Sequence, residues 1–131
     1  MDQQKDKIKT KKQPKWEREE VVLLVVEYFR TRDLSRTERI KSIGFISNLL
    51  RARATTLGMD IDETYRNEKG IEMKFGNIQS MDKKAVEEGK VGLTSASKLD
   101  VQVVREYYED ADMVVSEAYR VVMRYLDCII N

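Results

Sequence analysis

The apolar residues of this chain recur at three- and four-residue steps over most of its length, which is the spacing of helices that bury one face. The clearest stripes predict helices over about 36–56 and about 112–130. Residues 16–30 place acidic residues in a first turn and Arg30 near the end, which favours a helix over a buried strand. The two stripes are Ile40, Ile43, Ile46 or Ser47, and Leu50, and then Val115, Ala118, Val122, Tyr125 and Ile129.

Capping signals predict where several helices begin and end. Ser35 and Glu38 match the S-x-x-E capping box, and Gly58 lies just past the expected end of the same helix. Ser97 and Asp100 similarly form a predicted cap for a helix over LDVQVVREYYED. Between these elements, residues 79–98 are rich in Gly, Ser and Lys, which predicts a long loop with one short helical turn at 83–88.

The segment TYRNEKGIEMKFGNI, residues 64–78, fits two structures. Apolar residues that alternate with charged ones indicate a minor β element at 71–75, whereas the spacing of Ile71, Phe75 and Ile78 indicates a helix. We expect the helix, with these three residues buried and Lys74 projecting away from them. The expected fold class is therefore mainly α, a compact bundle of about five helices.

The length of 131 residues fits one domain of common size. We expect a disordered basic tail at 1–15 and a single helical domain at 16–131. The first residues contain no apolar run of a secretory signal, and the longest apolar run, VVLLVV at 21–26, is too short to span a bilayer. The single cysteine, Cys128, is expected to be a buried thiol in a reducing, cytoplasmic compartment.

The chain contains no histidine. This excludes Ser-His-Asp triads, Cys-His pairs, HExxH zinc sites and HNH nuclease chemistry. We expect no catalytic residue, no metal and no cofactor.

Charge is unevenly distributed along the chain. Residues 1–16 carry six lysines against two aspartates, and residues 30–54 carry seven basic against two acidic residues. Residues 99–131 carry three basic against seven acidic residues. A basic N-terminal half could hold a polyanion such as double-stranded DNA, although a solvated surface explains the same composition.

Arg66 and Asn67 precede the expected start of a helix, where free backbone N–H groups favour anions. Arginine binds phosphate or guanine through a bidentate fork, and asparagine can read adenine. The alternative is that Arg66 pairs with Asp62 or Glu63 and that Asn67 caps the helix. The predicted phosphate contacts are Arg51, Arg53, Arg66, Lys69 and Lys74, and the predicted base or modification readers are Asn67 and Asn77.

Several motifs occur in a recognisable order: WEREEVVLLVVEYFR, ISNLLR, YRNEKGIEMKFGNI, MD at 81–82, GL at 92–93, KLD at 98–100 and VVREYYEDADMVVSEA. From Trp16 to about residue 122, the chain resembles the N-terminal helical region of bacterial HNH endonucleases of the restriction and phage-defence type. The resemblance implies an α-helical, DNA-associated module. The chain departs from the pattern at Glu72, usually apolar or small, at Gly76, usually alanine, and after Asp82, where proline is common.

These observations predict a non-catalytic DNA-binding module that could read DNA modification. One alternative is an adaptor or inhibitor that binds a protein partner, or a second copy, through its C-terminal helices. Another is a metal-dependent nuclease with Asp60 and Glu72 as ligands and Lys74 polarising water. A continuous basic surface favours the first function, and an exposed apolar patch on the helix at 112–130 favours the second.

Overall fold

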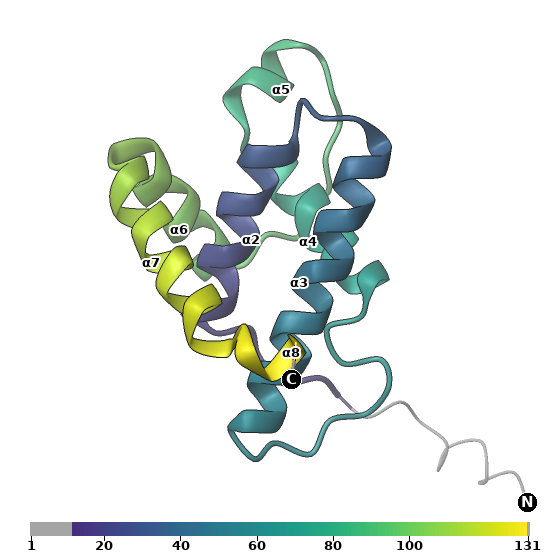
Figure 1. Ribbon diagram of the computed structural model, residues 1–131. Coiled ribbons are helices and arrows are strands. Elements are labelled where there is room, and N and C mark those ends of the chain that lie inside the picture. The colour runs from purple at the N-terminus through teal and green to yellow at the C-terminus, as the bar shows by residue number, and fades with distance from the viewer. Residues whose placement is uncertain (1–11, 131) are drawn as a thin grey trace, which may run out of the picture.

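The computed structural model describes residues 12–130, and the fold is mainly α, as the sequence predicts (Figure 1). The prediction of a minor β element at 71–75 is wrong, because these residues lie inside a helix. The helices are α2 (Arg18–Thr31), α3 (Arg36–Thr56), α4 (Glu68–Gln79), α5 (Lys83–Glu87), α6 (Lys98–Glu109), α7 (Ala111–Tyr125) and α8 (Asp127–Ile130).

Helix α2 forms the centre of the core. Every residue from Val21 to Val25 is buried, so this helix is covered on several sides and carries no simple apolar stripe. Figure 1 shows α2 between α3 on one side and the α6–α7 pair on the other. Helix α4 packs against both α2 and α3. Elements distant in sequence therefore meet on one central helix.

Helix α3 has the predicted bounds. The Ser35 hydroxyl accepts a hydrogen bond from the Glu38 N–H, and Gly58 adopts φ of +76° just beyond the end of the helix. Ile43 is buried as expected, but Ile40 is 46% exposed because it lies at the edge of a cleft. In α4, the predicted burial of Ile71, Phe75 and Ile78 is confirmed.

Helices α6 and α7 follow each other directly and pack together against α2. Ser97 and Asp100 form the predicted capping box of α6. The predicted last helix is interrupted at Leu126, and α8 follows. The buried stripe of α7 is Val114, Ala118, Val121 and Tyr125, so the predicted Val115 and Val122 are displaced by one residue. Valine pairs at 114–115 and 121–122 permit either face, and packing against α2 selects one.

The connection between α4 and α6 contains the predicted short helix, α5, followed by residues 88–97 without regular structure. This stretch passes close to α4. A Cβ atom on Gly92 would lie 2.7 Å from the Gly76 carbonyl oxygen, and one on Gly76 would lie 2.9 Å from the Leu93 side chain. The two glycines therefore permit a close contact between the loop and the helix.

Residues 13–15, which belong to the predicted tail, lie along the loop that precedes α4. The Gln13 amide donates to the Asp62 carboxylate at 3.2 Å, and the Pro14 and Lys15 carbonyls accept from Arg66. Most of the predicted tail, residues 1–11, lies outside the described residues.

The prediction of a buried cysteine is wrong. Cys128 lies in α8, after the break that follows α7; it is exposed, and its Sγ lies 3.3 Å from Thr56 Oγ1. Separately, none of the helices in the described part of the chain has the length and apolar character needed to cross a membrane.

Candidate functional site

Six of the seven predicted DNA contacts serve the fold, because they pair with internal groups. Arg66 is the clearest case, at 4% exposed. Its guanidinium donates two hydrogen bonds to the Glu20 carboxylate, at 2.7 and 3.0 Å, and lies 3.9 Å from the centroid of the Trp16 ring. Its ion-pair partner is therefore Glu20, and not Asp62 or Glu63 as in the alternative to DNA contact. Arg66 also has a positive φ of 47°, which is uncommon for a residue other than glycine.

Lys74 and Asn77 are buried, contrary to the prediction that Lys74 projects away from the buried residues of α4. The Lys74 ammonium donates to both carboxylate oxygens of Asp100 at 2.8 Å, which joins α4 to the start of α6. Asn77 is buried, and its Oδ1 accepts the N–H of Ser95 at 3.0 Å. The two side chains therefore hold α6 and the preceding loop against α4.

Three of the four remaining predicted contacts also bind groups of the protein itself. Arg53 is buried and binds the carboxylates of Glu17 and Glu19, which pulls its guanidinium away from solvent. Two others bind backbone: Arg51 donates to carbonyls of the loop before α4, and Asn67 caps α4 by accepting the Gly70 N–H at 2.8 Å. Lys69 alone of the seven is exposed.

The residues of the nuclease alternative do not form a recognisable metal site. Lys74 is engaged by Asp100, Glu72 is exposed on α4, and Asp60 lies in the loop before α4. Among the described residues, no group of three or more Asp, Glu, His or Cys side chains could hold a metal ion.

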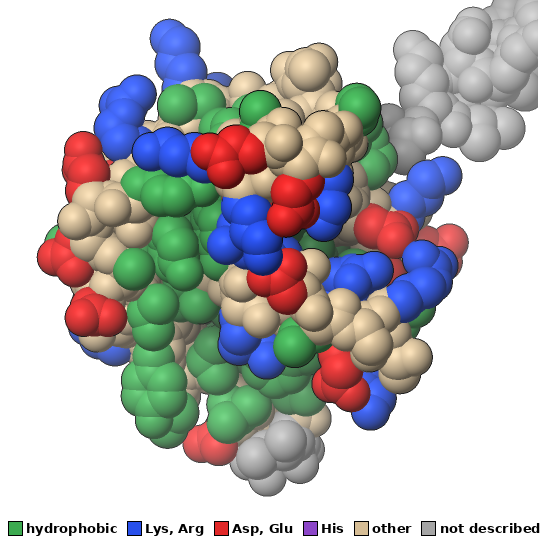
Figure 2. All heavy atoms as spheres, turned by 90° about the horizontal axis from the view of Figure 1, so that it is seen from above, with side chains coloured by type: hydrophobic (Ala, Val, Ile, Leu, Met, Phe, Trp, Pro, Cys, Tyr) green, Lys and Arg blue, Asp and Glu red, His purple; other side chains and the backbone are tan. Residues whose placement is uncertain are grey.

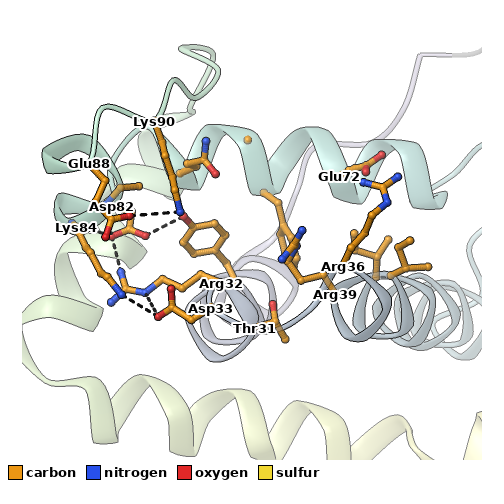
Figure 3. A pocket seen from close by; sticks show the side chains of 17 residues that line it. Thr31, Arg32, Asp33, Arg36, Arg39, Glu72, Asp82, Lys84, Glu88 and Lys90 are labelled. Carbon is orange, nitrogen blue, oxygen red and sulfur yellow. Dashed lines mark hydrogen bonds and ion pairs between the residues drawn. The ribbon is translucent and has the colours of Figure 1, made fainter.

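A cleft of about 360 Å³ lies where the end of α2 and the start of α3 meet α4 and α5 (Figure 3). Its volume falls within the common range for small-molecule sites, about 300–1,000 Å³. Its apolar lining comes from Tyr28, Ile40, Ile43 and Phe75. Its charged lining comes from Arg32, Asp33, Arg36, Arg39, Glu72, Asp82, Lys84, Glu88 and Lys90. Because five cations and four carboxylates line it, the cleft is not uniformly basic.

One wall of the cleft is a connected polar network. Asp82 is 1% exposed and accepts hydrogen bonds from the Tyr28 hydroxyl at 2.8 Å and from Arg32 at 2.5 Å. Asp33 then pairs with both Arg32 and Lys84. Burial works against the charged form of Asp82, but the hydrogen bonds from Arg32 and Tyr28 outweigh it and lower the pKa of this carboxyl. Burial, reinforced by Asp82, raises the pKa of the Tyr28 phenol.

The opposite wall carries Arg36 and Arg39, which have no carboxylate partner among the described residues. Arg39 donates to the backbone carbonyl of Leu34, and Arg36 has no ion pair with any described residue. Figure 3 shows both side chains extending from α3 toward α4, on the side of the cleft away from Lys84 and Lys90. These arginines retain free N–H donors for an anion.

A second exposed feature is an apolar strip on α7. Val115, Tyr119 and Met123 are spaced by four residues, so they share one side of the helix, and they are 42%, 63% and 53% exposed. We call these three residues the α7 strip. Seen from the α5 end of the molecule, basic and acidic side chains are interleaved and apolar side chains are exposed beside them (Figure 2). The apolar patch on the last long helix is therefore present, whereas this end of the molecule is not a continuous basic surface.

Comparisons with protein-family models, with curated proteins and with solved structures find no match for this chain. The resemblance to the N-terminal regions of HNH endonucleases remains an interpretation of the sequence motifs.

The environment of Arg66 predicts that it contributes to stability. Arg66→Ala should lower the free energy of unfolding by about 3–5 kcal/mol, since it leaves Glu20 as a buried, unpaired charge. Lys69→Ala, an exposed neighbour, is the control and should change stability by less than about 0.5 kcal/mol. Urea denaturation measures both. A loss below about 1 kcal/mol for Arg66→Ala would contradict the structural role.

The lowered pKa of Asp82 predicts a pH-dependent contribution to stability. Its folded pKa lies below the unfolded value of about 3.9, so its stabilising effect is complete above about pH 5 and disappears as the pH falls through the folded pKa. Asp82→Asn should cost roughly 2 kcal/mol at pH 7 and progressively less toward pH 2. The exposed Asp112→Asn is the control. A pH-independent difference for Asp82→Asn would show that the carboxylate charge is not what stabilises the network.

Proposed function

We propose that the protein is a non-catalytic binding module that contacts a helical segment of a partner protein through the α7 strip. The observation that carries this proposal is the exposure of Val115, Tyr119 and Met123 on one side of a helix whose other side is in the core. Aromatic and methionine side chains are enriched at protein interfaces, and contiguous exposed apolar residues mark such sites.

Charge at the two ends of the strip indicates the kind of partner. Asp112 lies in the first turn of α7 and Asp127 opens α8, and neither forms an ion pair with a described residue. A second copy packed antiparallel about Tyr119 would bring Asp112 of one molecule toward Asp127 of the other, which is repulsive. The better complement is a helix with an apolar centre and a cation at each end.

DNA binding, the function that the resemblance implies, is the second candidate. Its support is the position of Lys12 and Lys15, which are exposed in the segment that lies along the loop before α4. Lys69 follows in the first turn of α4 and is exposed too. These lysines would add to the basic N-terminal sequence as non-specific phosphate contacts.

A designed peptide tests the protein-binding function. A fluorescent amphipathic helix with an apolar centre and lysines roughly 20 Å apart, the span of about 15 helical residues, should bind the wild-type protein. Tyr119→Glu should weaken binding by about tenfold or more, because it places a charge against the apolar centre. Val91→Glu, at an exposed loop residue, should have no effect and serves as the matched control.

The same peptide with glutamates in place of the lysines distinguishes the outcomes. It should bind more weakly, and equal binding of the two peptides would contradict the role of Asp112 and Asp127. If the wild-type protein sediments as a dimer and the Tyr119→Glu variant sediments as a monomer, the strip would instead bind a second copy of the chain.

Salt dependence tests the DNA-binding candidate. In fluorescence polarisation with a duplex, the combined variant Lys12→Ala, Lys15→Ala and Lys69→Ala should flatten the log–log salt slope by about 0.9 for each DNA phosphate that the variant no longer neutralises. Lys98→Ala, an exposed lysine at the start of α6, is the control. An unchanged slope would exclude these three lysines as phosphate-binding groups.

A further inference from the structure

We infer that the cleft between α3 and α4 binds a small ligand bearing a dianionic phosphate, held by Arg36 and Arg39. This site is separate from the α7 strip and does not depend on the proposed function.

The balance of charge around the cleft identifies the two arginines as the binding groups. Arg32 is held by Asp82 and Asp33, and Lys84 is held by Asp33. These cations already have carboxylate partners at 2.5–3.7 Å. Lys90 also has one, since it lies 3.4 Å from Glu88.

Arg36 and Arg39 differ because neither pairs with a carboxylate among the described residues. Arg39 uses one nitrogen for the Leu34 carbonyl, at 2.6 Å, and its remaining N–H donors are not used by another described residue. Two guanidinium groups that line the same cavity can offer paired, charge-assisted hydrogen bonds to the oxygens of one anion.

Glu72 narrows the class of ligand. It lines the same cleft from α4 and has no ion pair with a described residue, so it offsets part of the positive charge of the arginines. A monoanion such as a carboxylate would gain little against this background. A phosphate monoester carries a charge of about −1.5 to −2 at pH 7 and offers three acceptor oxygens, so it retains a net attraction.

The apolar lining accommodates the rest of the ligand. Tyr28 and Phe75 pack edge to face at 5.7 Å between ring centroids, and Ile40 and Ile43 line the cleft from α3. The Tyr28 hydroxyl is held by Asp82, so this wall is fixed before a ligand arrives. A phosphate joined to a planar or apolar group, as in a nucleoside monophosphate, matches this combination of surfaces.

Isothermal titration calorimetry with AMP, adenosine, inorganic phosphate and a DNA duplex that lacks terminal phosphates tests the inference. AMP should bind, and adenosine should bind at least about tenfold more weakly, because it lacks the phosphate. The double variant Arg36→Ala and Arg39→Ala should weaken AMP binding by at least about tenfold. Arg105→Ala with Arg120→Ala, two exposed arginines on α6 and α7, is the matched control and should leave binding unchanged.

Glu72→Gln provides an independent variant that should act in the opposite direction. Removing the opposing carboxylate should strengthen AMP binding by a few-fold, which a misfolded protein could not show. Binding of the duplex that is abolished in the Arg36 and Arg39 double variant, without binding of AMP, would overturn the inference, because the phosphodiesters of a duplex are monoanions. No binding of any phosphate probe at millimolar concentration, or AMP binding unaffected by the double variant, would overturn the inference.

Discussion

The buried ion pair between Arg66 and Glu20 is the contact on which the arrangement of the other elements depends. It joins the loop before α4 to the first turn of α2, and both charged groups are almost fully withdrawn from water. Removing two charges from water is unfavourable unless their geometry is good and their remaining hydrogen-bonding groups are satisfied. Here Arg66 also donates to the Pro14 and Lys15 carbonyls and stacks on Trp16, so the pair fixes three segments at once.

Residues from Asn67 to Asn77 also join α4 to other parts of the chain. Asn67 caps the helix, Lys74 binds Asp100 at the start of α6, and Asn77 holds the N–H of Ser95. Trp16 lies beneath both cations, with the Lys74 ammonium 5.0 Å from its ring centroid. The regular spacing of polar residues in YRNEKGIEMKFGNI is thus explained by internal partners. A motif of Arg, Asn, Lys and Asn can reflect what the fold requires, even where its residue types suit DNA.

Capping residues and the spacing of apolar residues predict the helices well, because both depend on residues only a few positions apart. The predictions for Ser35, Ser97 and the stripe in α4 are all correct for this reason. The α7 stripe is displaced because its paired valines allow two faces, and only packing against α2 distinguishes them. The roles of Gly76 and Gly92 depend on a loop that approaches α4 from 16 residues further along the chain, which spacing along the sequence cannot show.

Partners of the charged residues are the least predictable feature, since they come from distant parts of the chain. In the sequence, Glu20 is the one residue that indicates such a partner. It lies beside the apolar run at 21–26, and an acid so close to a buried segment needs a cation.

Distant ion pairs account for part of the acidic excess of residues 99–131. Arg18 of α2 binds Glu106 and Glu117, and Lys74 of α4 binds Asp100, so cations of two other helices neutralise three acids of this segment. These three acids therefore join α6 and α7 to α2 and α4, and their charge is not available to a binding partner. Charges without such partners are the better guide to binding. Among them, Arg36 and Arg39 line the cleft, and Asp112 and Asp127 lie near the ends of the α7 strip.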